Sequence, residues 1–159
     1  MAKKYYPKKP SPIPLTQAAL DEAKQKVEKL STYREEVLVR LQTAREMGDL
    51  SENGAYTAAR FELGDTDRKL RHYRRLVMFG VVPEKKVGGV IGFGSQVTLD
   101  LDGKEITYTL VSRYEADPTK QKLSVDSPIG FALLDKSEGN EVTIETPRGK
   151  RIYKILKVY

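Results

Sequence analysis

The polar residues best placed to do chemistry form one short run, Gly48-Asp49-Leu50-Ser51-Glu52-Asn53. Asp49 and Glu52 are three residues apart, and both carboxylates can point forward from a chain reversal. Mg²⁺ binds carboxylate oxygens, but it prefers six oxygen ligands and often shares its sites with water and phosphate. Two carboxylates are therefore an incomplete metal site, which a second macromolecule could complete. Alternatively, both acids only stabilise a helix start through its dipole.

The composition excludes most other kinds of catalytic site. The chain has 159 residues, no Cys, no Trp and a single histidine, His72. A disulfide scaffold and a thiolate zinc site are excluded, and a histidine relay would depend on one residue. We expect His72 to lie on a helix surface. The chain is therefore predicted not to be an enzyme and to need no cofactor in isolation.

The charge is uneven along the chain. Residues 1–82 contain 16 basic and 11 acidic side chains, and the remaining residues contain 12 and 11. An anionic partner is expected for the first half, either nucleic acid or an acidic protein surface. No apolar run is long enough for a membrane span, and the N-terminus lacks the apolar core of a secretory signal. A cytoplasmic monomer without membrane contact is expected.

A long helix is predicted after a flexible basic arm at residues 1–12. Thr16 is a candidate N-cap, and the chain then contains neither Gly nor Pro before Gly48. Apolar residues recur in steps of three and four, interrupted once by Arg34, which indicates a heptad seam. The seam residues are Leu20, Ala23, Val27, Leu30, Val37, Leu41 and Ala44.

A second helix with the same period is predicted after the reversal. Gly48 suits the end of the first helix, and Ser51 can cap the second. The second seam contains Tyr56, Ala59, Leu63, Thr66, Leu70, Tyr73 and Val77. Two such helices with a short connection pack antiparallel, and about 30 residues give a rod roughly 45 Å long. Residues 13–82 are therefore predicted to form a coiled-coil hairpin with an acidic tip.

Arginines follow the tip on the second predicted helix. Arg60, Arg68, Arg71 and Arg75 can share one broad face because their spacing approximates whole helical turns. Such a face could contact RNA phosphates. An ordinary solvated coiled-coil surface is the alternative, and Tyr56 is expected to pack in the seam.

Residues 83–159 change to the period of strands. Val97-Leu101 and Ile106-Leu110 alternate around Asp102-Gly103, which predicts a hairpin. A further strand is expected at 123–125, and another hairpin at 142–158 with a turn at 147–149. Ser127-Pro128 is typical of a helix start. The whole chain is therefore predicted to be α+β, with the helical hairpin followed by a small sheet that carries one short helix.

These motifs together resemble the bacterial Gre transcript cleavage factors. The run from Gly48 to Asn53, followed by Tyr56 and Ala58-Ala59-Arg60, is similar to the coiled-coil domain of that family. The second half is similar to the family's FKBP-like C-terminal domain through the segments Phe93-Gly94, Glu115-Ala116-Asp117, Ser124–Gly130 and Thr146-Pro147-Arg148-Gly149.

The resemblance implies an RNA polymerase partner that binds the C-terminal domain, with Asp126, Ser127, Pro128 and Ile129 as expected docking residues. The coiled coil would enter the secondary channel, where Asp49 and Glu52 would help hold a Mg²⁺ ion shared with the polymerase. The polymerase would then cleave backtracked RNA. The residues expected near the nascent RNA 3′ end or the polymerase are Ser51, Asn53, Tyr56, Arg60, Arg68, Arg71 and Arg75. DNA binding is expected as part of the same association.

One departure from the family pattern leaves a second function open. The family commonly has a third acid directly before the tyrosine, where this chain has Gly54-Ala55. A relative that occupies the channel without promoting cleavage is therefore the alternative. A third hypothesis, an FKBP-like prolyl isomerase or chaperone, needs an aromatic-walled pocket, but several aromatic residues of this half are needed to fill its core.

Overall fold

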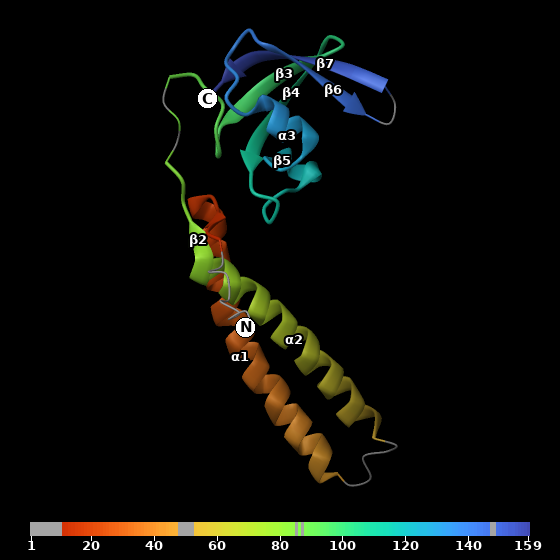
Figure 1. Ribbon diagram of the computed structural model, residues 1–159. Helices are drawn as coiled ribbons and strands as arrows, with labels where there is room; N and C mark the ends of the chain where they lie inside the picture. Colours follow the sequence, from red (N-terminus) through yellow and green to blue (C-terminus); the bar gives the residue numbers. More distant parts are fainter. Residues whose placement is uncertain (1–10, 48–52, 85, 87, 147–148) are drawn as a thin grey trace, which may run out of the picture. The chain divides into compact units, whose positions relative to one another are not determined.

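The computed structural model describes residues 11–159 except 48–52, 85, 87 and 147–148 (Figure 1). Two compact units are present, one containing Gln17–Gly80 and one joining Ile13–Thr16 to Val81–Tyr159. Most of the predicted N-terminal arm lies outside the described residues. None of the helices in the described part of the chain is long and apolar enough to cross a membrane.

The first unit is the predicted helical hairpin. Helices α1 (Gln17–Glu46) and α2 (Gly54–Phe79) lie side by side and run in opposite directions (Figure 1). Every predicted seam residue of both helices is buried or half-buried. The most deeply buried side chains include Val37 on α1 and Leu70 on α2. The heptad spacing therefore predicted correctly which faces pack together.

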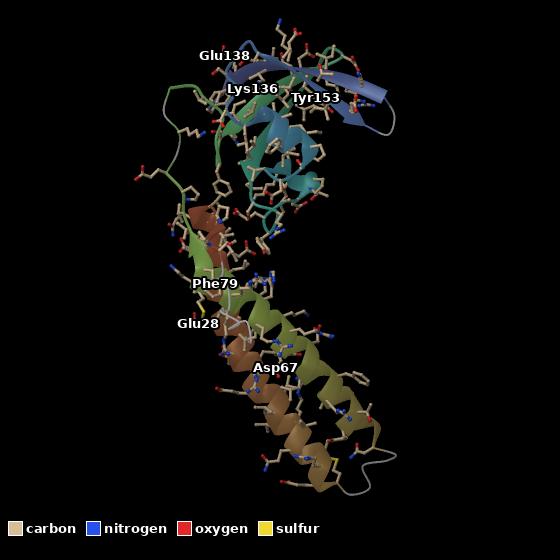
Figure 2. The ribbon with its side chains drawn as sticks, viewed as in Figure 1. Glu28, Asp67, Phe79, Lys136, Glu138 and Tyr153 are labelled. Carbon is tan, nitrogen blue, oxygen red and sulfur yellow. The ribbon has the colours of Figure 1, made fainter. Side chains whose placement is uncertain are left out.

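Polar contacts join the two helices at defined positions along their length. Arg34, which interrupts the α1 seam, is half-buried, and its Nε lies 2.7 Å from Oδ1 of Asp67 on α2 (Figure 2). Closer to the reversal, Arg40 Nη2 lies 3.0 Å from Glu62 Oε1, and Tyr33 also donates a hydrogen bond to Glu62. The hairpin thus joins an apolar seam to charged contacts that favour one register.

The second unit is built on a curled, mixed sheet in the order β5-β4-β3-β7-β6. Its strands are β3 (Gln96–Leu101), β4 (Lys104–Val111), β5 (Lys122–Ser124), β6 (Glu141–Thr146) and β7 (Gly149–Val158). The β4–β5 pair is parallel and the other pairs are antiparallel. Asp102 and Gly103, both at positive φ, form the predicted turn between β3 and β4.

Helix α3 (Pro128–Leu133) lies against one face of this sheet (Figure 1). The core between them includes Ile91, Leu99, Leu133 and Ile155. Of the aromatic residues, Tyr153 (Figure 2) is buried in this core, whereas Phe131 is exposed. A side chain at Gly130 would place its Cβ 2.0 Å from the Ser124 carbonyl oxygen, so α3 can approach β5 only because this residue is glycine.

The segment before α1 belongs to the second unit. Strand β1 (Ile13–Pro14) pairs with β2 (Gly80–Val81), and the Leu15 amide donates to the Val81 carbonyl at 2.9 Å. Thr16, immediately before α1, donates from its amide to Glu115 Oε1 at 2.9 Å and from its hydroxyl to Oε2. The sequence had indicated only a helix start at Thr16.

Candidate functional site

The side chain of Asn53 stabilises the reversal between α1 and α2 with two hydrogen bonds. Its Oδ1 accepts a hydrogen bond from the Tyr56 amide at 3.0 Å, which makes Asn53 the N-cap of α2. Its Nδ2 donates to the carbonyl oxygen of Ala44 at 2.7 Å, in the last turns of α1. One carboxamide therefore caps the second helix and holds it to the first, which brings the two ends of the connection together.

The predicted N-cap of the second helix was wrong, because the cap is Asn53 and not Ser51. Both residue types are good N-caps, but a carboxamide offers an acceptor and a donor on separate atoms and has the longer reach. Contact with Ala44 requires that reach. The sequence alone could not reveal this preference, because it depends on how closely the two helices approach.

The two tip carboxylates, Asp49 and Glu52, lie outside the described residues, as does Ser51. Their position in the sequence places them between Met47, just after α1, and Asn53, the cap of α2. Within the described part of the chain, no three His, Cys, Asp or Glu side chains form a group that could hold a metal ion. The two acids therefore remain predicted metal-binding residues.

Behind the tip, the structure brings three of the predicted arginines together on the outer face of α2. Arg60, Arg68 and Arg71 line one hollow with Thr57, Phe61 and Gly64. Arg75 is also exposed, one turn beyond Arg71. Tyr56 is half-buried in the seam, as expected, and His72 is exposed on the helix surface, also as expected.

The carboxylates near these arginines are held in ion pairs. Asp65 lies 2.7 Å from Lys69 Nζ and 3.6 Å from Arg68 Nη2. The hydrogen bond from Lys69 is the main reason why the pKa of Asp65 is below its ordinary value. One turn earlier on α2, the hydrogen bond from Tyr33 and then that from Arg40 lower the pKa of Glu62. Both acids therefore remain ionised at neutral pH, and each forms an ion pair with a basic side chain on the surface of the hairpin.

The predicted docking residues surround the start of α3. Ser127 is the N-cap of this helix: its hydroxyl accepts from the Gly130 amide at 3.1 Å and donates to the Ser124 carbonyl at 2.6 Å. Pro128 and Asp126 are exposed, and Ile129 is half-buried against the core. Ser127 therefore shapes the surface, while its neighbours can contact a partner.

Two exposed aromatic residues were missed as site candidates by the sequence reasoning. Phe61 on α2 has 76% of its surface exposed, and Phe131 on α3 has 74%. Phe61 falls outside the seam, a signal that could have identified it. For Phe131, the sequence favoured a core role, and only the packing of α3 on the sheet shows that it points outward.

The described residues thus form a long helical hairpin with arginines on the outer face of α2, and a small mixed-sheet unit. Comparisons with known proteins specify the class. Residues 13–77 match the family model "Transcription elongation factor, N-terminal", and residues 85–159 match "Transcription elongation factor, GreA/GreB, C-term". The two matches cover both units.

Individual relatives agree with these models. Transcription elongation factor GreA of Maridesulfovibrio salexigens is 41% identical over 152 residues, which covers 93% of this chain and 95% of that protein. GreA of Bacillus subtilis is 38% identical over 150 residues, with 92% and 96% covered. The chain therefore belongs to the GreA/GreB family of transcription elongation factors.

Among solved structures, the GreA factor homolog 1 (Gfh1) of Thermus thermophilus is 28% identical to the chain. The match covers 93% of this chain and 99% of that one, with a TM-score of 0.45. Family membership agrees with the prediction that the chain is a regulator and not an enzyme. The family descriptions name no DNA ligand, so DNA binding remains only an expectation from the sequence.

Proposed function

We propose that this elongation factor binds RNA polymerase, inserts its helical hairpin into the secondary channel, and stimulates the polymerase to cleave backtracked RNA. The observation that supports this proposal most directly is the position of the two acids. Asp49 and Glu52 fall in the short connection between two helices of 30 and 26 residues, at the end of the hairpin opposite the two helix ends that continue into the other unit.

The chemistry at the tip follows from charge and donor type. Carboxylate oxygens are suitable Mg²⁺ ligands, and two of them leave most of the coordination sphere to the polymerase and the RNA phosphate. A bound Mg²⁺ ion can activate water and stabilise the leaving oxygen in such a cleavage. The role of Asp49 and Glu52 is to raise the occupancy of that site, while Asn53 holds the start of α2 behind them.

The other contacts divide between the two units. Arg60, Arg68, Arg71 and Arg75 are exposed on α2, and we assign them to RNA phosphates or acidic polymerase surfaces. Asp126, Pro128 and Ile129 surround the start of α3, where Ser127 fixes the backbone, and we assign this surface to polymerase docking.

The test compares the amide variants Asp49→Asn and Glu52→Gln with wild type in a stalled elongation complex. Removing one charge should slow stimulated cleavage by roughly tenfold or more, and additional Mg²⁺ should partly restore the rate by mass action. Glu46→Gln, at an exposed carboxylate that ends α1, is the matched control and should leave cleavage unchanged. Unchanged cleavage in both tip variants, with normal thermal melts, would contradict the proposal.

A second function, occupation of the channel without stimulated cleavage, is favoured by one observation. Ala55 is exposed in the first turn of α2, where the family commonly has an acid. If a third acid is needed, Ala55→Glu should increase stimulated cleavage, whereas wild-type protein should inhibit elongation without releasing RNA fragments. Strong fragment release by the wild type would exclude this second function.

A further inference from the structure

An exposed aromatic ring and a glycine lie next to one another on the outer face of α2. Phe61 and Gly64 are three residues apart, so they occupy adjacent turns of one helix face. Together with Thr57, Arg60, Arg68 and Arg71 they line a hollow of about 430 Å³. All of these residues are exposed and belong to the hairpin unit alone.

Phe61 is not needed for packing of the hairpin. The seam beside it is made by Ala59, Leu63 and Thr66, and 76% of the Phe61 surface remains exposed. A single exposed apolar side chain is common in proteins and indicates nothing on its own. The surroundings of this ring distinguish it from an ordinary surface residue.

Gly64 has no structural explanation within the chain. Glycine weakens a helix interior relative to alanine, and Gly64 lies near the middle of α2. A Cβ atom at this position would meet nothing within 4 Å, so packing does not require its absence. The missing side chain instead leaves open space beside the Phe61 ring, into which a group from outside the molecule can fit.

The charges around the hollow select an anionic ligand. Arg60, Arg68 and Arg71 are all exposed. Among the described residues, the acids of this stretch pair with other side chains: Asp65 with Arg68 and Lys69, Glu62 with Arg40, and Asp67 with Arg34. Arg60 and Arg71 therefore keep their charge available. The residues of the hollow itself include three arginines and no acid. Arginine binds phosphate through two parallel hydrogen bonds and also stacks on planar groups.

We propose that Phe61 and Gly64 form a stacking platform for an unpaired base of single-stranded RNA, and that the neighbouring arginines bind its flanking phosphates. A flat ring beside an open hollow fits a planar base, and arginines on the turns before and after Gly64 can contact phosphates of one strand along α2. The proposal deepens the proposed function and rests on it, since backtracked RNA is the single strand that the hairpin would meet.

The experiment measures binding of a fluorescent single-stranded RNA oligonucleotide to the full chain, by anisotropy and without polymerase. Phe61→Ala should weaken binding roughly 5- to 150-fold, the range for loss of one stacked base, and Phe61→Trp should retain it. Met78→Ala, another exposed large apolar residue of α2, is the matched control and should bind as wild type.

Two further variants separate stacking from charge. Arg71→Gln should reduce the dependence of log K on log salt by about one unit of slope, whereas Phe61→Ala should lower affinity with an unchanged slope. Gly64→Gln should raise the melting temperature, because it improves the helix, and should weaken RNA binding, because it fills the hollow. A purely structural role for Gly64 predicts no loss of RNA binding.

Wild-type RNA affinity in Phe61→Ala would overturn the proposal, and so would equal affinity for single-stranded and duplex RNA. Binding of poly-glutamate, but not RNA, through Phe61 would assign the surface to an acidic protein instead. Because no polymerase is present, these results are independent of the proposed function. If the wild-type protein bound RNA through Phe61 but did not stimulate cleavage in an elongation complex, that result would contradict the proposed function and leave the RNA-binding proposal intact.

Discussion

At the scale of single residues, the features that matter most are side chains that perform two structural tasks. Asn53 caps α2 and also bonds to the last turns of α1, and Ser127 both accepts from Gly130 and donates to Ser124. Each fixes the backbone next to a surface that is predicted to contact the polymerase. Their roles are positional, since the polar atoms that could contact a partner already have intramolecular partners.

Asn53 allows the two bonds to be separated by substitution. Asn53→Ala removes both and should lower the free energy of unfolding by about 1–2 kcal/mol. Asn53→Ser keeps a cap but is too short to reach Ala44, so its loss should be smaller. Urea unfolding of the two variants measures the difference. Equal stability of the alanine and serine variants would show that the cap contributes nothing, and wild-type stability of both would refute the whole account of Asn53.

At the scale of elements, the hairpin joins an apolar seam to charged contacts across it. Arg34 occupies a seam position and pairs with Asp67, and Glu62 receives contacts from both Tyr33 and Arg40. The guanidinium carbon of Arg40 also lies 5.7 Å from the centre of the Tyr33 ring, within the range of a cation–π interaction. These contacts join α1 to α2 in the half of the hairpin that approaches the tip.

Glu62 gives this set of contacts a defined pH dependence. Its pKa in the folded protein is below the ordinary value of 4.5, chiefly because of the Tyr33 hydrogen bond. The folded state therefore binds fewer protons than the unfolded state in this range, so the stabilisation is complete above about pH 4.5 and is lost as pH falls through the lower, folded pKa. When the pH is lowered from neutral to acidic, the urea midpoint should therefore decrease less in Glu62→Gln than in wild type.

Other carboxylates with lowered pKa values, such as Asp65 and Asp117, contribute equally to both proteins in that comparison. Glu35→Gln is the matched control, because Glu35 is exposed on α1 and has no ion-pair partner among the described residues. An acid response in Glu62→Gln identical to that of wild type would show that the contacts with Tyr33 and Arg40 do not stabilise the hairpin.

At the scale of the whole molecule, the two units suggest a division between docking and chemistry. The double variant Asp126→Ala/Phe131→Ala changes exposed side chains around α3 and should weaken polymerase binding about thirtyfold, as for a hot spot of roughly 2 kcal/mol. Asp49→Asn with Glu52→Gln should leave affinity nearly intact while it slows cleavage. Competition against labelled wild type measures both, and equal losses of affinity would contradict this division of labour.

The sequence by itself determined the elements, because their signals are local. Steps of three and four residues placed both helical seams, and the positive φ values of Asp102 and Gly103 are those that an Asp-Gly turn favours. Ser127-Pro128 correctly predicted the start of α3. The resemblance to the Gre factors also came from short motifs, and the family comparisons confirmed it.

Only the tertiary structure decided how distant residues meet. The sheet order β5-β4-β3-β7-β6 and the parallel β4–β5 pair depend on long-range pairing, for which a single sequence carries no local signal. The same holds for the pairing of Arg34 with Asp67 and for the contact of Thr16 with Glu115. Asn53 and not Ser51 is the cap of α2, because the separation of the two helices decides which side chain can reach across to Ala44.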